Sequence, residues 1–435
     1  MLEKSQRAIR VSVVLRSVWR THRESCRRPF AAQPEPAFCR SQLQQKSVAK
    51  CLAACTLADV TPRLRLPRLL LAHFLSYATC SVAMASSHLV FFGTYTRSTS
   101  RGIYAAQLDG STGTLSPPVL VAETANPTWI TFSPDRRFLY ASHGSRAQAV
   151  AYAIDRSGPK LVPLPAPAAA AEAGSNACHL TTDRTGTLLL TANYGEGFIS
   201  ALRINQDGTL GEPRSIRHTG HGPNPQRQEK PHVHSVTVSP DNRHVIVCDL
   251  GLDRIFTYAL ELREAAVTTP PVAVAEAQPC SGPRHFKFSA DGKRGYALTE
   301  MGATIEVYDY DASRGALTRK QIISTLPSDF QAKWGAEIRL HPNGRFLYAS
   351  NRGHDSLAVF AIDGTDGTLG LVEIVSSGGK VPRNFELSPD GQWLVCAHQE
   401  SGGVHVFRVD EASGRLTKTP QVTEIAMAVC VAFLE

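Results

Sequence analysis

One stretch decides the fold of this chain: residues 228–254, which read QEKPHVHSVTVSPDNRHVIVCDLGLDR. It contains two short runs rich in β-branched residues, 236–238 and 245–247. Between them lies a Ser-Pro-Asp-Asn cluster of the kind that forms tight turns. The pattern predicts two antiparallel strands joined as a hairpin.

The open end of this hairpin carries unusual polar residues. His232 and His234 precede the first strand, and Asp249 and Arg254 follow the second. In an antiparallel pair these positions lie together, at the end away from the turn. The stretch therefore brings two imidazoles, a carboxylate and a guanidinium to one edge of a sheet.

The hairpin is repeated along the chain. Its turn Asp or Asn recurs at positions 135, 183, 241, 291, 343 and 390, in steps of 47 to 58 residues. A strand-only repeat of about 50 residues is typical of a β-propeller, with one sheet for each repeat. The sequence therefore predicts an all-β fold: a seven-bladed β-propeller of four-stranded antiparallel blades over residues 84–435. Six repeats are distinct, and we expect residues 88–94 and 429–433 to share the seventh blade, which would close the ring without open edges.

The basic charge of the chain belongs to its first part. Residues 1–83 contain 14 Lys and Arg against 4 Asp and Glu, whereas the remainder contains 32 against 34. The propeller therefore shows no bias toward nucleic acid. Residues 1–83 form a basic N-terminal extension with three open explanations: a secretory signal ending in the 63–85 stretch, an organelle transit peptide, or sequence upstream of a true start at Met84. The apolar run in this stretch is too short to span a membrane, and no membrane segment is predicted.

The cysteines indicate the compartment. Five of the ten lie in the propeller region, scattered, odd in number and without zinc-ligand spacing: Cys178, Cys248, Cys280, Cys396 and Cys430. This usage predicts buried free thiols in a reducing compartment. We therefore expect a cytoplasmic protein, with export as the alternative if the 63–85 stretch is a signal peptide.

One face of the predicted ring is rich in His, Arg and Glu, because each repeat places such residues before its first strand and after its second. Arginine can bind carboxylate or phosphate bidentately and can stabilise an oxyanion, while histidine is the commonest general base. These residue types favour a small anionic, ester-like substrate. The candidate catalytic residues are His232, His234, Arg284, Glu300 and Arg352, and the candidate substrate-binding residues are His179, Arg254, His285, Glu337 and Arg383.

Several alternatives remain open for these residues. Any one of them could serve only in structural hydrogen bonds, as most buried polar groups do. His232 and His234 could also bind a metal, although no carboxylate partner is evident and we predict no metal site. The Gly- and Pro-rich loop 218–231 is either a rim over the site or a tolerated insertion. No G-x-S-x-G, P-loop or H-E-x-x-H motif is present, which favours direct attack by water over a serine nucleophile.

Three motifs in order resemble a known family: PHVHS at 231–235, GPRH at 282–285 and SNRGHDS at 350–356. They are similar to those of the seven-bladed propeller lactonases of the bacterial 6-phosphogluconolactonase type. The related fungal 3-carboxy-cis,cis-muconate lactonizing enzymes are also similar. The resemblance covers residues 88 to 433. It implies a site formed by His232 or His234 with Arg284, Glu300 and Arg352, and it implies no metal or organic cofactor.

The expected function is hydrolysis of a sugar-acid lactone, 6-phospho-D-glucono-1,5-lactone, in the pentose phosphate pathway of glucose metabolism. In this hypothesis a histidine with Glu300 activates water, Arg284 stabilises the oxyanion, and Arg352 with Arg383 holds the phosphate. A carboxy-muconate-type cycloisomerase is one alternative, and a non-catalytic scaffold propeller is another. The expected partner is a small anionic lactone, with no nucleic acid or membrane, and the protein is expected to be a monomer or a weak homo-oligomer.

Overall fold

The computed structural model describes residues 87–434, except 144–148, 156–157, 159, 167–176, 332–333 and 402. The chain divides into two units, Met1–Thr79 and Cys80–Glu435, and every described residue belongs to the second. The predictions made for residues 1–83, including the targeting hypotheses and the start at Met84, lie outside the described residues. Within the described residues, no helix is long and apolar enough to cross a membrane.

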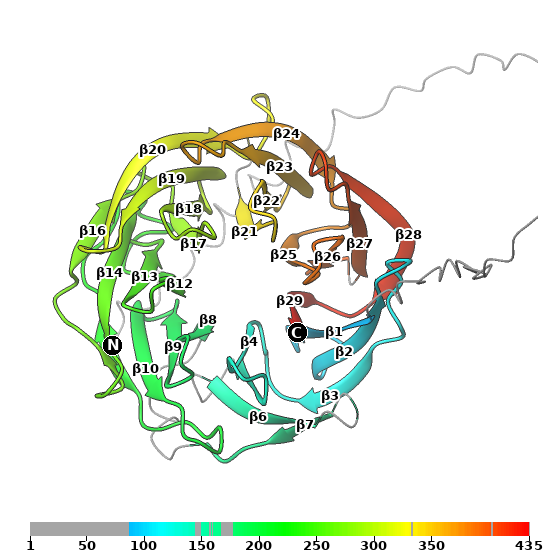
Figure 1. The fold of residues 1–435 in the computed structure, drawn as a ribbon, viewed down its shortest axis with the longest axis horizontal. Helices are drawn as coiled ribbons and strands as arrows, with labels where there is room; N and C mark the ends of the chain where they lie inside the picture. The colour runs from blue at the N-terminus through cyan, green and yellow to red at the C-terminus, as the bar shows by residue number, and fades with distance from the viewer. Residues whose placement is uncertain are drawn as a thin grey trace, which may run out of the picture. The chain divides into compact units, whose positions relative to one another are not determined.

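The second unit is a ring of seven antiparallel sheets around a central channel, which confirms the predicted seven-bladed propeller (Figure 1). The described residues form strands and no helix. Six sheets have four strands. In the seventh, β14 (Arg254–Glu261) pairs with both β15 (Ala266–Val267) and β16 (Ala273–Glu276).

The strands follow one another from the channel outward in most blades (Figure 1). The first sheet contains β29 (Ala428–Leu434), β1 (Ser87–Thr94), β2 (Gly102–Asp109) and β3 (Val119–Glu123). The second contains β4 (Ile130–Phe132), β5 (Phe138–Ser142), β6 (Ala149–Asp155) and β7 (Lys160–Pro163). The third contains β8 (Ala177–Thr182), β9 (Leu188–Asn193), β10 (Phe198–Arg203) and β11 (Arg214–Arg217), and the fourth opens with β12 (Val233–Val238) and β13 (His244–Asp249). The fifth sheet contains β17 (Pro283–Phe288), β18 (Arg294–Thr299), β19 (Thr304–Asp311) and β20 (Ala316–Ser324). The sixth contains β21 (Gly335–Leu340), β22 (Phe346–Asn351), β23 (Ser356–Ile362) and β24 (Leu369–Ser376). The seventh contains β25 (Pro382–Leu387), β26 (Trp393–His398), β27 (Gly403–Val409) and β28 (Leu416–Glu424).

The ring closes where the two ends of the propeller meet. Strand β29 pairs antiparallel with β1, with Leu89 opposite Leu434 and Phe92 opposite Val431. Both strands are predominantly buried. The shared blade predicted from the sequence is therefore confirmed, and neither strand is left as an open edge.

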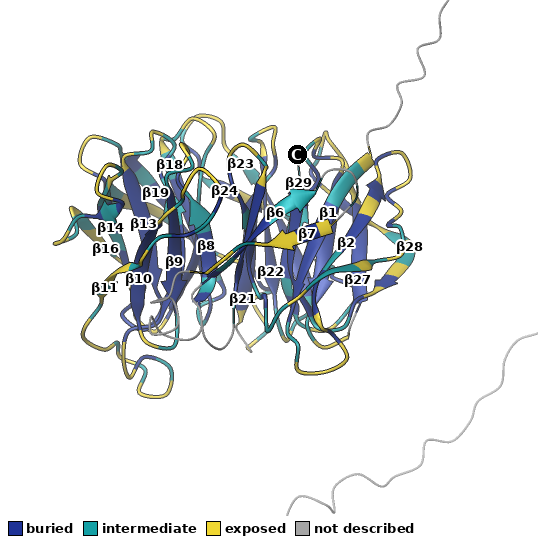
Figure 2. Ribbon diagram, turned by 90° about the horizontal axis from the view of Figure 1, so that it is seen from below, coloured by how far each residue is buried: buried dark blue, intermediate teal, exposed yellow. Residues whose placement is uncertain are grey.

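Burial follows the position of each strand in its blade. The second strands of several blades, such as β9, β13 and β22, are buried along their whole length. Outer strands such as β7 and β28 are largely exposed or half-buried, as Figure 2 shows. Blades pack face to face, so the second strand is covered by a neighbouring blade on each side. This packing explains why its sequence reads as a continuous apolar run.

Buried tyrosines tie neighbouring blades together. Tyr140, Tyr296 and Tyr348 occupy the same position in β5, β18 and β22, and all are fully buried. Their hydroxyl groups donate to the carbonyl oxygens of Gly208, Gly367 and Gly414 in the next blade, at 3.0 to 3.2 Å. Each phenol thus fills the core and satisfies its one polar atom.

The five propeller cysteines are free thiols, as predicted. Four of them are buried or half-buried in the sheets. Cys280 is exposed, and the prediction of burial was wrong there. It lies outside the strands, in the connection between β16 and β17, where solvent reaches the side chain.

Candidate active site

A β-bulge near the start of the innermost strand sets the site. In the blade of β12, Val233 pairs with Asp249 and Ser235 pairs with Cys248, so His234 is an extra residue between two ladder pairs. The same irregularity occurs in three further blades, where the extra residue is Cys178, Arg284 or Arg383. A bulge interrupts the alternation of a strand and re-aims one side chain. All four bulged side chains line one cavity.

This cavity has a volume of about 300 Å³ and lies at the end of the channel opposite the Pro-Asp turns. Its walls contain five arginines and, among the described residues, one carboxylate, Glu300. The arginines are Arg97, Arg227, Arg284, Arg352 and Arg383. The cavity is therefore strongly positive and suited to an anionic ligand.

Glu300 is the centre of the cavity's ion pairs. It directly follows β18, and its side chain is only 6% exposed. One carboxylate oxygen accepts from Arg227 Nη2 at 2.6 Å, and the other from Arg284 Nε at 3.1 Å and Arg352 Nη2 at 2.9 Å. Burial acts to raise the pKa of Glu300, but the charges of Arg352 and Arg284 outweigh it and hold the pKa well below its usual range. Glu300 is therefore a carboxylate at neutral pH.

Arg284 is fixed by acceptors on three sides. Besides Glu300, its Nη1 donates to the carbonyl oxygen of Ala336 and lies 3.2 Å from Nε2 of His285. Burial, together with the charges of Arg352 and Arg383, lowers the pKa of Arg284 to about 10. The guanidinium therefore remains charged at neutral pH and keeps one orientation.

Among the described residues, His234 is one of two histidines that line the cavity, the other being His285. Its Nε2 lies 3.9 Å from the Glu300 carboxylate, which is longer than a hydrogen bond. On its other side, Nδ1 lies 3.9 Å from Sγ of Cys178. Burial and then the charge of Arg284 lower the pKa of His234 well below 6.5. The ring is therefore neutral at physiological pH and able to accept a proton.

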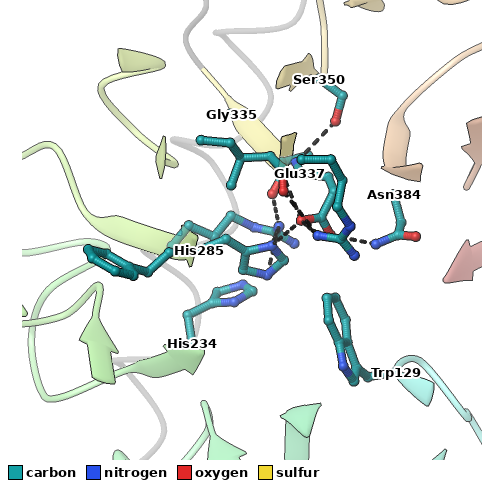
Figure 3. Close-up of polar contacts among 12 residues, drawn as sticks. Trp129, His234, His285, Gly335, Glu337, Ser350 and Asn384 are labelled. Atoms are coloured by element: carbon teal, nitrogen blue, oxygen red, sulfur yellow. Dashed lines mark hydrogen bonds and ion pairs between the residues drawn. The ribbon is translucent and has the colours of Figure 1, made fainter. Parts of the chain in front are cut away.

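A layer of buried polar groups underlies the cavity (Figure 3). His285 Nδ1 lies 2.9 Å from a carboxylate oxygen of Glu337, which also accepts from Arg339 and Asn384. Because Nδ1 donates to this carboxylate, Nε2 of the neutral ring is left to accept from Arg284. The layer thus holds Arg284 from below.

The cavity brings together six of the ten predicted residues, and a seventh lies directly beneath it. His234, Arg284, His285, Glu300, Arg352 and Arg383 all line it. Glu337 is fully buried directly beneath. The predicted convergence of His, Arg and Glu at the open ends of the hairpins is therefore present in the structure.

His232 and Arg254 lie apart from the cavity. His232 precedes the bulge, stacks on Tyr194 at a ring-centroid distance of 4.5 Å, and bonds to the Tyr194 carbonyl oxygen. Arg254 begins the third strand of its blade, where its half-exposed side chain pairs loosely with Glu276 at 3.7 Å. Neither residue is among those that line the cavity.

His179 lines a second cavity and not the first. It is 4% exposed, and its ring packs against Trp129 at a centroid distance of 4.0 Å. It lines a second cavity of about 740 Å³ that reaches the turn residues Pro134 and Ser388 at the other end of the channel. A direct contact with a ligand of the first cavity is therefore not supported for His179.

The His232 and His234 side chains diverge, because the bulge at His234 breaks the alternation between them. Within the part of the chain that the structure describes, no group of three or more His, Cys, Asp or Glu side chains is arranged to hold a metal ion.

Sequence reasoning missed several cavity residues. Arg227 comes from the 218–231 loop, and its contact with Glu300 favours the interpretation of this loop as a rim over the site. Tyr95 and Arg97 come from the connection after β1, and Tyr194 directly follows β9. The unusual length and polarity of the 218–231 loop was a signal for Arg227. The 95–101 connection matches no other repeat and gave no comparable signal.

The chain was compared with known proteins. The family described as "Lactonase, 7-bladed beta-propeller" matches residues 89–433. A 6-phosphogluconolactonase of Bacillus subtilis is 35% identical over 353 residues, covering 80% of this chain and 99% of the relative. A 6-phosphogluconolactonase of Formosa agariphila is 29% identical over 348 residues, covering 76% of this chain and 95% of the relative.

Solved structures agree with this match. The periplasmic gluconolactonase of Pseudomonas aeruginosa is 32% identical and superposes with a TM-score of 0.75, covering 80% of this chain and 99% of its own. The family match spans nearly all the described residues, from β1 to β29, and includes every residue of the cavity. The chain therefore belongs to the seven-bladed β-propeller lactonase family.

Proposed function

We propose that this protein hydrolyses 6-phospho-D-glucono-1,5-lactone to 6-phosphogluconate, the lactonase step of the pentose phosphate pathway. One observation carries the proposal: a single cavity presents a neutral histidine, a carboxylate and five arginines on a lactonase fold. The phosphorylated lactone is an anion of the size and charge that such a cavity suits. The names of the relatives from Bacillus subtilis and Formosa agariphila support the same substrate.

His234 is the proposed general base. Its lowered pKa keeps the imidazole neutral at physiological pH, so it can take a proton from the attacking water. The imidazolium formed in this step lies 3.9 Å from the Glu300 carboxylate, which stabilises its positive charge. Glu300 itself is a weak base, because its pKa is well below its usual range. Its role is electrostatic.

Arg284 is the proposed oxyanion donor. Water oxygen attacks the lactone carbonyl carbon, and the carbonyl oxygen becomes a negatively charged tetrahedral oxygen that accepts from the Arg284 guanidinium. The bond from the carbonyl carbon to the ring oxygen then breaks. The ring oxygen takes the proton from His234 and becomes a hydroxyl group. One water is consumed and the product is an open-chain acid, ionised at neutral pH.

Arg352 is the proposed link between the ion pairs of Glu300 and the bound substrate. Its Nη2 bonds to Glu300 and to the carbonyl oxygen of Gly335, at 2.9 and 3.0 Å. Its Nε is buried and has no partner among the described residues. A free guanidinium donor at the cavity wall is suited to a lactone hydroxyl or carbonyl oxygen. We therefore place Arg352 at the reacting end of the substrate, in place of the phosphate contact expected from the sequence.

The test is hydrolysis of freshly prepared 6-phosphogluconolactone by the purified full-length protein, corrected for spontaneous opening and run beside glucono-1,5-lactone. We expect rapid turnover that is faster with the phosphorylated lactone, and a loss of about 100-fold or more in His234→Asn. His221→Asn is the matched control, because His221 is exposed and, among the described residues, bonds only to its neighbour Gly222. Absence of turnover on both lactones would overturn the proposal.

The proposal has a consequence for location. A phosphorylated sugar lactone is an intracellular metabolite, so the substrate fits the cytoplasmic location expected from the cysteines. Fractionation of cells that express the full-length chain checks this expectation. Recovery of the protein outside the cytoplasm would favour an unphosphorylated lactone as the substrate.

A further inference from the structure

The five arginines of the cavity fall into two sets. Arg227, Arg284 and Arg352 all donate to Glu300. Arg97 and Arg383 line the same cavity but form no ion pair or hydrogen bond with any described residue. The first set is partly neutralised by its carboxylate. The second set keeps its full positive charge.

The second set is organised by one aromatic ring. The guanidinium carbon of Arg97 lies 4.6 Å from the ring centroid of Tyr95, and that of Arg383 lies 5.7 Å from it. A cation over an aromatic face is stabilised without losing its hydrogen-bond donors. Tyr95 therefore contacts both guanidinium groups, and their N–H groups have no partner among the described residues.

Two adjacent blades bring these residues together. Tyr95 and Arg97 follow β1 of the shared blade, and Arg383 is the bulged residue of β25 in the neighbouring blade. Burial lowers the pKa of both Arg284 and Arg352, and the charge of Arg383 lowers both further. Both sets line the same cavity of about 300 Å³, so the second set lies within the reach of a small substrate bound beside the Glu300 cluster.

Two like charges in one cavity, with no carboxylate partner among the described residues, favour the binding of an anion. Arginine binds phosphate through parallel N–H donors, and two arginines can satisfy several of its oxygens. The Glu300 carboxylate repels a phosphate from the other set. The two corners of the cavity therefore differ in the charge that they accept.

We propose that Tyr95, Arg97 and Arg383 form a subsite for the phosphoryl group of the substrate, separate from the Glu300 corner where the lactone carbonyl reacts. This inference rests on the proposed function, because it divides one substrate between the two corners. The subsite determines specificity for a phosphorylated over an unphosphorylated ligand.

The test measures binding in the absence of chemistry. Calorimetry compares the affinity of the full-length protein for 6-phosphogluconate and for gluconate, which differ only in the phosphoryl group. We expect 6-phosphogluconate to bind about 10- to 100-fold more tightly. Arg97→Ala and Arg383→Ala should each reduce this ratio by about tenfold.

Arg101→Ala is the matched control for these variants. Arg101 lies in the same connection as Arg97, but its exposed side chain pairs with Glu123 at 3.0 Å and is not part of the cavity. The affinity ratio should be unchanged in this variant. Circular dichroism of each variant shows whether the fold is retained.

Two results would overturn the subsite: equal affinity of the unaltered protein for the two ligands, or an affinity ratio that survives in the Arg97→Ala, Arg383→Ala double variant. Preferential binding of 6-phosphogluconate that depends on both arginines supports it. The same binding result in a protein that hydrolyses neither lactone would uphold the subsite and reject the proposed function. Failure of the subsite and failure of the proposed function are therefore distinguishable.

Discussion

The two ends of each inner hairpin are built by different kinds of contact. At the turn end, Ser133, Ser239 and Ser289 each donate to an Asp two residues later, at 2.6 Å. At the open end, Glu300 accepts from Arg227, Arg284 and Arg352, which lie 73, 16 and 52 positions away in the sequence. These arginines come from three blades or their loops. The turn is a local structure that each repeat forms by itself. The site exists only when several blades are assembled.

This difference predicts that changes at the two ends have separate effects. A substitution in the cavity should reduce catalysis more than stability. A substitution at a turn should reduce stability and leave kinetics unchanged.

The largest effect is expected for Arg284→Ala. Loss of the oxyanion donor should reduce kcat/KM for the phosphorylated lactone by about 100- to 1,000-fold. The reduction should fall mainly on kcat, because the donor acts in the transition state. Initial rates on the phosphorylated lactone, with circular dichroism as a test of folding, provide the measurement.

Arg284→Lys is the matched variant for charge. It keeps the positive charge but cannot contact Glu300, His285 and the Ala336 carbonyl oxygen together, so it should recover only part of the activity. A folded Arg284→Ala protein with unaltered turnover would contradict the assignment of Arg284.

A smaller effect, on stability alone, is expected for Asp183→Ala at the turn of the β8–β9 hairpin. Asp183 is fully buried and accepts from the backbone N–H groups of Thr185, Thr187 and Leu188. Its loss should lower the free energy of unfolding by about 2 to 3 kcal/mol, because charged hydrogen bonds to buried donors are removed. Urea denaturation measures this change, and kcat/KM should stay the same.

Asp207→Ala is the control for Asp183→Ala. Asp207 lies in the connection between β10 and β11, where it is exposed and accepts from Thr209. Its effect on stability should be much smaller. An equal loss of unfolding free energy in both variants would show that burial of the turn carboxylate does not contribute to stability.

The smallest effect is expected on kcat/KM for a change of pH from 7 to 6. The base form of His234 is the neutral imidazole, and its pKa lies well below 6.5 because of burial and the charge of Arg284. Activity is lost only as pH falls through that lowered pKa, so kcat/KM should change little between pH 7 and pH 6. A pH–rate profile with an inflection near 6.5 would show that the base is a less buried group than His234.

The sequence predicted the features that each repeat carries locally. The blades, the closure by β1 and β29, and the face that collects His, Arg and Glu all follow from the spacing of the turns and strands. The bulges could not be predicted, because an extra residue becomes visible only when the partner strand is in place. For this reason the sequence could not separate His234 from His232.

The remaining differences have the same origin. Arg254 was expected at the site because it follows the second strand, but it starts the third strand and points toward Glu276. Arg227, Tyr95 and Arg97 reach the cavity from connections that do not follow the repeat. Their positions depend on the closed ring, which no single repeat describes.

The pairing of β1 with β29 has a consequence for the order of assembly during synthesis. The two strands that form this pair are about 340 residues apart in sequence, so a growing chain cannot complete the ring until its last strand has emerged. Tyr95 and Arg97 are then among the first propeller residues made, yet the wall that joins them to Arg383 is complete only after β29 has been made. A ribosome-bound chain would therefore carry a folded run of blades with an unfinished pocket, and catalytic competence would be acquired only once β29 has emerged and paired with β1.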